Sequence, residues 1–209
     1  TIGGTNAGDS ITTGSNNTVI GKDAGTAITT GIQNTALGSG ALDSNTTGQY
    51  NTAIGLNALG AVTTSERNTA VGRSALLLST GSQNTGVGFN VLADNTTGQY
   101  LTAIGSRALK ANTTADSNTA VGTDALLSNT TGTQNTAVGS LALDANTTAN
   151  SNVAMGYNTL GANTTGDQQT AVGTYALQAN TTGVQNSAFG STALYSNTTA
   201  DNNLSLIHI

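Results

Sequence analysis

The 209 residues include only 7% charged and 3% aromatic side chains, with 27 glycines and no cysteine, proline or tryptophan. The cations are few and form no basic stripe, so we expect no nucleic-acid binding through the phosphate backbone: Lys22, Arg67, Arg73, Arg107 and Lys110. The absence of cysteine excludes disulfides and thiolate metal sites. No apolar run approaches the roughly 18 residues of a membrane span, so no membrane insertion is expected.

One unit of 17 residues repeats along almost the whole chain. The sequence NTALG at residues 34–38 recurs as NTAIG from Asn51 and as NTAVG from Asn68, Asn118 and Asn135. Weaker copies begin at Asn17, Asn84, Leu101, Asn152, Gln169 and Asn186, and only the step from Asn68 to Asn84 is 16 residues. We number the unit N-T-A-φ-G-x-x-A-L-x-x-N-T-T-G-x-x from position 1, where φ is a large apolar residue. A short fixed period indicates a unit that stacks on copies of itself.

The first two units, within residues 1–33, are variants of this consensus. Ala7-Gly8 and Ala24-Gly25 replace Ala-Leu at positions 8 and 9, and an isoleucine appears instead at position 12, as Ile11 and Ile28. We expect the cross-section of the array to change there. From residue 34 onward the consensus is closely followed until residue 203.

Each unit is typical of one coil of a β-solenoid. Seventeen residues are too few for a helical hairpin, and Gly, Asn and Thr rank poorly in helix interiors. Thr with Val or Ile suits strands, whereas Gly and Asn suit the corners between them. Low charge and few aromatics also occur in disordered chains, but a large apolar residue at the same phase in each copy favours a folded array. We predict an all-β, parallel β-solenoid of about twelve coils stacked at about 4.8 Å, forming a single array over residues 1–203.

Four repeat positions predict the core and the assembly. Position 4 is always large and apolar and is predicted to point inward: Ile20, Leu37, Ile54, Val71, Val87, Ile104, Val121, Val138, Met155, Val172 and Phe189. Position 9 is predicted to form a second interior stack: Leu42, Leu59, Leu76, Leu92, Leu109, Leu126, Leu143, Leu160, Leu177 and Leu194. The alanines at positions 3 and 8 would then form a small, apolar outer face. Because a lone coil would have a thin core, we expect a homotrimer that shares this alanine face, a trimeric β-roll, in preference to a solitary solenoid.

The chain departs from the repeat after residue 203. Asn203 opens a new copy in register, and residues 204–209 (LSLIHI) then abandon the pattern. This hexapeptide resembles the translation of a sequencing-adapter or cloning scar, with an unrelated C-terminal tail as the alternative. We interpret the chain as an excerpt of a longer protein.

The repeat resembles two known families of fibrous proteins. Its A-[IVL]-G-x-x-A core, as in residues 53–58, is similar to the head repeats of trimeric autotransporter adhesins. The longer N-T-A-I-G-x-x-A-L-x-x-N-T-T-G form is similar to repeat regions of phage tail fibres. The resemblance implies a left-handed β-roll, three chains side by side, and an extracellular fibre. The unit departs from the adhesin head because its Asn-Thr-Thr corner lengthens the period.

We expect no catalytic, cofactor-binding or metal-binding residue. The only histidine is His208, and the ten acids lie at scattered repeat positions, which favours solvated surface charge over the paired carboxylates of a glycosidase. The aromatic residues are also scattered. The Asn-Thr-Thr corners match the N-glycosylation pattern, but a hydrogen-bonded asparagine ladder between coils is the better interpretation.

These observations favour a non-catalytic shaft segment of an extracellular phage tail fibre that supports host attachment. Its expected partners are copies of itself and, at the host surface, a glycan or protein receptor. A bacterial trimeric adhesin head is the alternative. Ice binding is a third hypothesis, disfavoured because the two corner threonines are adjacent, as in Thr46-Thr47, and should point in opposite directions.

Overall fold

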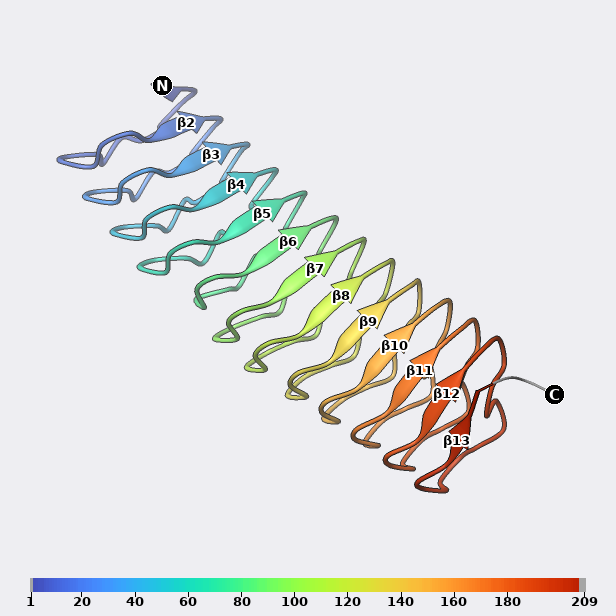
Figure 1. Cartoon of the computed structure of the whole chain (residues 1–209). Helices are drawn as coiled ribbons and strands as arrows, with labels where there is room; N and C mark the ends of the chain where they lie inside the picture. The colour runs from blue at the N-terminus through green and yellow to red at the C-terminus, as the bar shows by residue number, and fades with distance from the viewer. Residues whose placement is uncertain (1, 207–209) are drawn as a thin grey trace.

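The computed structural model describes residues 2–206 and folds them into one continuous stack of coils, with the two ends of the chain at opposite ends of the stack (Figure 1). Thirteen short strands form a single parallel sheet in sequence order, and residues 2–206 contain no helix. The strands are β1 (Ile2–Gly3), β2 (Thr18–Ile20), β3 (Thr35–Leu37), β4 (Thr52–Ile54), β5 (Thr69–Val71), β6 (Thr85–Val87), β7 (Thr102–Ile104), β8 (Thr119–Val121), β9 (Thr136–Val138), β10 (Val153–Met155), β11 (Thr170–Val172), β12 (Ser187–Phe189) and β13 (Leu204–Ser205). The predicted all-β, parallel β-solenoid is confirmed.

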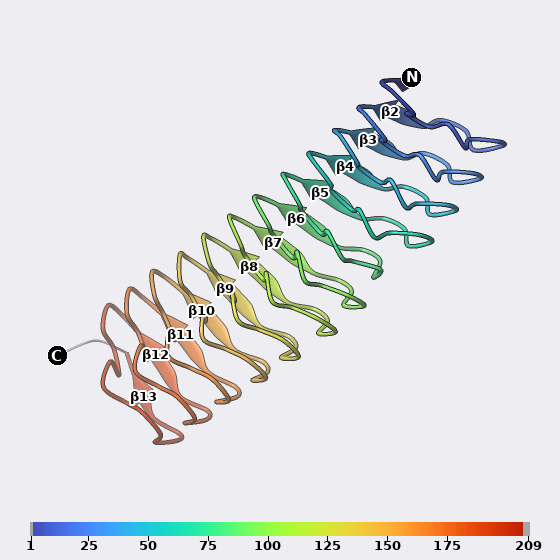
Figure 2. The same cartoon turned by 180° about the vertical axis from the view of Figure 1, so that it is seen from behind.

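The strands pair in strict repeat register. Thr35 lies beside Thr52 and Ala36 beside Ala53, so each residue contacts its equivalent in the next coil. The 16-residue unit keeps this register, since Ala70 pairs with Gly86. The missing residue is therefore removed from the corner after Thr80, away from the sheet. Figure 2 shows the same unbroken stack from behind.

The core is built from positions 3, 8 and 9. Leucine at position 9 is fully buried from Leu42 to Leu177 and half-buried at Leu194, as predicted. The alanines at positions 3 and 8 are also buried, for example Ala53 and Ala58 at 0% exposure. The prediction of an outer alanine face is therefore wrong.

The large residue at position 4 points outward, which corrects the predicted interior stack. Ile20, Leu37, Ile104, Met155 and Phe189 are 39–43% exposed, and the others in this column are half-buried. Every three-residue strand buries its middle residue and exposes the two flanking ones to differing degrees, as strand alternation requires. Position 3 therefore faces the core and position 4 faces outward, the reverse of the prediction.

The narrow interior explains this inversion. A Cβ atom added to Gly86, at position 3, would lie 3.1 Å from Val91 Cγ1 and 3.2 Å from Leu76 Cδ1. Position 3 thus faces the side chains of positions 8 and 9 at van der Waals distance. Once one leucine per coil is inside, only alanine or glycine fits opposite it, and the bulky neighbour at position 4 is left outside.

The buried leucines adopt a backbone conformation that leucine rarely uses. All ten at position 9 have φ between 49° and 54°, in the left-handed region. Two residues in the variant coils, Gly8 and Gly25, hold the same position with φ of 60° and 53°. There Ile28 at position 12 fills the space, because a Cβ atom on Gly25 would come within 2.8 Å of Ile28 Cδ1. The variant coils therefore keep the same backbone path, and isoleucine at position 12 takes the place in the core of leucine at position 9.

The stack continues into the segment that departs from the repeat. In β13, Leu204 pairs with Ser187 and Ser205 with Ala188. His208 and the rest of residues 207–209 lie outside the described residues.

Candidate functional site

Two buried asparagine columns join each coil to its neighbours. At position 1, the Asn51 side-chain oxygen accepts the Asn68 backbone N–H at 3.0 Å, and its Nδ2 donates to the Ser65 carbonyl at 2.8 Å. At position 12, Asn112 Nδ2 donates to Asn95 Oδ1 at 2.8 Å, and this pattern repeats through the following coils. The predicted asparagine ladder is confirmed.

The same burial bears on the glycosylation motif. Each Asn-Thr-Thr asparagine from Asn95 to Asn180 is 0% exposed, and its amide nitrogen is hydrogen-bonded within the stack. Because this nitrogen is buried and hydrogen-bonded, a sugar cannot be attached to it in the folded chain. The motif has a structural role here.

The corner threonines form a second hydrogen-bonded row. Thr113 Oγ1 donates to the Thr130 carbonyl at 3.1 Å, and Thr130 Oγ1 donates to the Thr147 carbonyl at 3.0 Å. The next residue in each corner is exposed, as at Thr131 and Thr148. The two threonines therefore differ in environment, and the hydroxyl group at position 13 donates its hydrogen bond to a backbone carbonyl.

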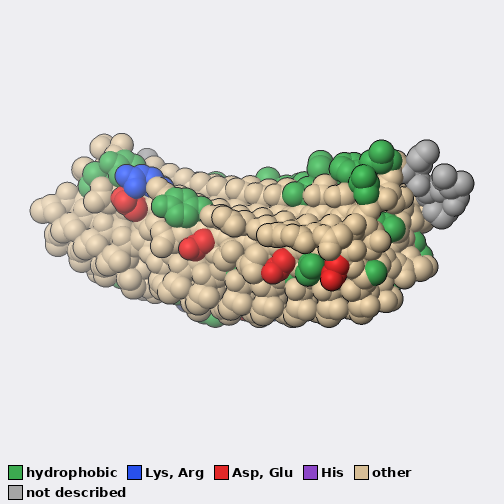
Figure 3. All heavy atoms as spheres, turned by 60° about the horizontal axis from the view of Figure 1, so that its bottom comes forward, with side chains coloured by type: hydrophobic (Ala, Val, Ile, Leu, Met, Phe, Trp, Pro, Cys, Tyr) green, Lys and Arg blue, Asp and Glu red, His purple; other side chains and the backbone are tan. Residues whose placement is uncertain are grey.

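The acidic residues are spread along the stack, at most one to a coil. Within residues 2–206, no group of three or more His, Cys, Asp or Glu side chains could hold a metal ion. Figure 3 shows acidic side chains separated from one another on the face that it displays. Instead, Asp124 pairs with Arg107 at 2.6 Å and Asp94 with Lys110 at 2.8 Å, each across one coil step.

Acids at position 16 have a role that the sequence did not reveal. Asp116 accepts the Gln99 backbone N–H at 2.7 Å, and Asp167 accepts the Asn150 N–H at 2.6 Å. Each carboxylate therefore caps a backbone amide of the preceding coil. The signal available in the sequence was their shared repeat position with Asn150, whose side chain does the same for Thr133.

Two carboxyl groups at position 10 are perturbed by their surroundings. Partial burial raises the pKa of Asp43, and hydrogen bonds from the backbone of Asp43 and Ser44 oppose that rise. Partial burial likewise raises the pKa of Asp144, with a smaller contribution from the negative charge of Asp124. Burial disfavours the charged form of a carboxyl group, which gives both shifts their direction.

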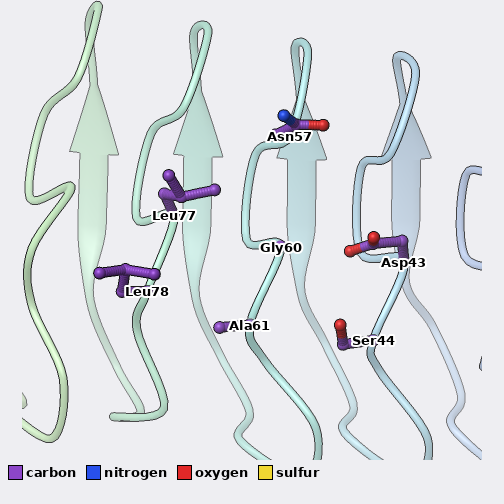
Figure 4. Close-up of a pocket in the computed structure, with 7 residues that line it drawn as sticks. All are labelled: Asp43, Ser44, Asn57, Gly60, Ala61, Leu77 and Leu78. Atoms are coloured by element: carbon purple, nitrogen blue, oxygen red, sulfur yellow. The ribbon is translucent and has the colours of Figure 1, made fainter.

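Asp43 borders an open hollow of about 300 Å³ on the surface of the stack. Asp43 and Ser44 lie on one side, Leu77 and Leu78 on the other, and Gly60 on the coil between them (Figure 4). The remaining lining residues are Asn57 and Ala61. The hollow exists because small residues occupy positions 10 and 11 of one coil between larger ones. Its lining contains one carboxylate, that of Asp43.

Three aromatic residues that look scattered in the sequence meet in space. The Tyr157 and Tyr175 rings lie edge to face with centroids 5.4 Å apart, and Tyr175 and Tyr195 do the same at 6.4 Å. They occupy positions 6, 7 and 10 of three successive coils. We call them the tyrosine row. Their meeting depends on the tight turns of this segment, which the repeat pattern alone does not define.

Comparison with known proteins gives no match to a family model, a curated protein or a solved structure. No helix in residues 2–206 is long and apolar enough to cross a membrane.

Proposed function

We propose that this chain is a non-catalytic shaft segment of an extracellular fibre, the tail fibre of a phage, that supports host attachment. The repeated side chains support it, because they pack the core or hydrogen-bond one coil to the next. The side chains of Asn51, Thr113 and Asp167 each hydrogen-bond to a backbone group of a neighbouring coil. A stack joined by identical contacts has a length set by its number of repeats, which suits a spacer.

The outward apolar column carries this proposal. Eleven consecutive coils place a large apolar side chain at position 4 on the outer face of the sheet, from Ile20 to Phe189. Exposed apolar surface that runs the whole length of a molecule marks an interaction site. The column contains no charge, and its direction along the stack suits another stack lying alongside. We propose a homotrimer of this chain, with the position-4 column replacing the alanine face as the shared surface.

The size of this surface sets the expected strength of assembly. Eleven rungs at about 4.8 Å give a strip roughly 50 Å long, and a width near 10 Å gives roughly 500 Å² per chain. A standard interface buries about 800 Å² per partner. Flanking residues must therefore join the contact, and exposed Leu56 and Phe89 at position 6 are adjacent candidates. Association should strengthen as the number of coils grows.

The assembly is tested by charge substitution on the outward column. Val87→Lys, Val121→Lys and Met155→Lys, combined in one chain, place charges on alternate coils without entering the core. Analytical ultracentrifugation should show a trimer for the parent and a monomer for this variant, with unchanged circular dichroism. The matched control carries Thr97→Lys, Thr131→Lys and Thr165→Lys at exposed corners of the same coils and should remain trimeric. A monomeric intact fibre at micromolar concentration would overturn the proposed assembly.

The fibre role is tested by locating the protein. Antibodies against the stack should label tails of virions in negative-stain electron micrographs. Labelling of a bacterial envelope instead would replace the tail fibre with the adhesin alternative.

One observation keeps ice binding as a second candidate. Thr at position 2 shares the outer face with position 4, so a threonine row runs beside the apolar column through Thr119 and Thr136. This row differs from the corner threonines considered in the sequence. A monomer that produces thermal hysteresis at micromolar concentration would favour ice binding over the fibre.

A further inference from the structure

Sequence variation among the repeats falls at positions 6, 7, 10 and 11 and again at positions 16 and 17. Positions 1, 3, 5, 8 and 9 hold nearly the same residues in each consensus coil, because they fill the core or turn the chain. Positions 6, 7, 10 and 11 instead differ from coil to coil. This variable face contains the hollow beside Asp43, the Arg107–Asp124 and Lys110–Asp94 ion pairs, and the tyrosine row. In repeat proteins, the face that varies from repeat to repeat is often the face that binds a ligand.

Within that face, the tyrosine row is the densest aromatic feature. Tyr157 and Tyr195 are each 45% exposed, and Tyr175 between them is half-buried. The central backbone is held in place, since the Tyr175 N–H donates to the Tyr157 carbonyl at 3.0 Å. Edge-to-face contacts at 5.4 Å and 6.4 Å add stability and restrict ring motion. The row therefore presents ordered aromatic surface whose conformational entropy is already reduced.

The surroundings of the row are polar but carry no charge. Positions 6 to 11 of its three coils contain no Asp, Glu, Lys or Arg. Amide and hydroxyl groups accompany the rings instead, at Asn158, Thr174, Gln178 and Thr192. Apolar ring faces beside neutral donors and acceptors match the surface of a pyranose, whose C–H face is apolar and whose edge carries hydroxyl groups. A charged glycan would find no counter-charge here.

We infer that the tyrosine row binds a neutral polysaccharide along its length. Sugar rings stack on exposed tyrosine rings, and the neighbouring amides and hydroxyls hydrogen-bond to sugar hydroxyl groups. Rings on three successive coils favour a polymer over a monosaccharide, because adjacent weak contacts then act together. The inference rests on the proposed function only in that an attachment fibre meets surface polysaccharide.

The absence of tryptophan gives a direct optical test. The five tyrosines are the fluorescent residues, and Tyr50→Phe with Tyr100→Phe leaves the row as the source of the emission. The full chain with these two changes is titrated with dextran, a soluble β-glucan and a galactomannan, and separately with the anionic polymer hyaluronan. We expect a saturable change in emission with at least one neutral polymer and none with hyaluronan.

Variants then assign the binding to the row. In native gels containing the bound polymer, the parent should be retarded, and Tyr157→Ala, Tyr175→Ala and Tyr195→Ala together should weaken binding at least about tenfold. Tyr50→Ala with Tyr100→Ala, at exposed tyrosines outside the row, is the matched control and should bind like the parent. If the triple variant loses its circular dichroism, Tyr195→Ala alone is used, and it should weaken binding measurably.

The outcomes separate this inference from the proposed shaft. Equal retardation of the row variant and the parent would overturn the site. Binding to hyaluronan alone, or to none of the neutral polymers, would overturn the ligand class. None of these results affects the sedimentation and labelling experiments, which test the shaft independently.

Discussion

The side-chain oxygen of Asn118 accepts the backbone N–H of Asn135, one coil further along the stack, at 2.8 Å. The same side chain donates from Nδ2 to the Gly132 carbonyl at 2.7 Å. One buried asparagine thus satisfies a backbone donor of the next coil and a backbone acceptor near the end of its own repeat unit. Leu101 occupies the equivalent position one coil earlier, so the stack tolerates a break in this ladder.

We therefore expect Asn118→Ala to destabilise the chain without preventing folding. Removing both hydrogen bonds leaves a buried N–H and a buried carbonyl short of a partner, which costs about 2–4 kcal/mol in total. Urea unfolding followed by circular dichroism measures the loss. The neighbouring exposed residue supplies the control, and Ser117→Ala should change stability by less than about 0.5 kcal/mol. Equal effects of the two changes would contradict the ladder's role.

A second prediction concerns compensation within one coil. Gly86 replaces the usual alanine at position 3, and Val91 replaces the usual alanine at position 8. Gly86→Ala alone should crowd Val91 Cγ1, which lies 3.1 Å from the added Cβ, and Val91→Ala alone should leave a cavity. The double variant restores the consensus pair. We expect it to be at least about 1 kcal/mol more stable than the sum of the single changes predicts, measured by a double-mutant cycle; strict additivity would count against direct packing of the two side chains.

A third prediction concerns the glycine at position 5. Gly122 has φ of 136°, and a Cβ atom there would lie 2.6 Å from the carbonyl carbon and oxygen of Gly139. Gly122→Ala should cost about 3–5 kcal/mol, because neither the backbone angle nor the adjacent coil can adjust cheaply. Gly60→Ala is the control, because a Cβ atom there would lie no closer than 3.3 Å to another atom, Leu77 Cδ1. Thermal melts should show a large fall for the first change and a small one for the second.

How far the sequence predicted the fold is clear from positions 3 and 4. The period, the parallel stacking and the buried leucine at position 9 follow from spacing and residue type. Strand alternation separates Ala53 from Ile54, but it does not say which of the two faces inward. Size suggested the isoleucine, and the inference failed because the leucines already fill a narrow interior. The pairing of Gly86 with Val91 was the available clue, since only residues sharing the core need to compensate in volume.

The tyrosine row was less predictable for a geometric reason. Tyr157, Tyr175 and Tyr195 occupy three different repeat positions, so a comparison by column separates them. They meet because the turn that carries them includes left-handed residues, among them Tyr175 at φ 59° and Leu194 at φ 50°. Positive φ recurs at positions 7 and 9 along the stack, but it is uncommon for bulky residues and was not expected from their residue types. The backbone had to be known before the contact could be seen.

The last prediction concerns pH and the carboxyl group of Asp144. Burial, reinforced by the charge of Asp124, raises the pKa of Asp144 above its ordinary value of 3.8. The folded chain therefore holds this proton more tightly than the unfolded chain does. The resulting stabilisation is fully present below pH 3.8 and is lost as pH rises through the higher pKa of the folded state.

At neutral pH the charged Asp144 is therefore a cost to the folded state, and Asp144→Asn should raise the melting temperature at pH 7. The gain should shrink as the pH falls and disappear below about pH 3.8, where the Asp144 carboxyl group becomes protonated in both the folded and the unfolded chain. Asp9→Asn removes one negative charge at an exposed site and serves as the control for net charge. Melting curves recorded from pH 3 to pH 7 for both variants measure the difference. A gain that stays constant across this range would show that the substitution acts through packing or hydrogen bonding, because only a titrating charge makes the gain depend on pH.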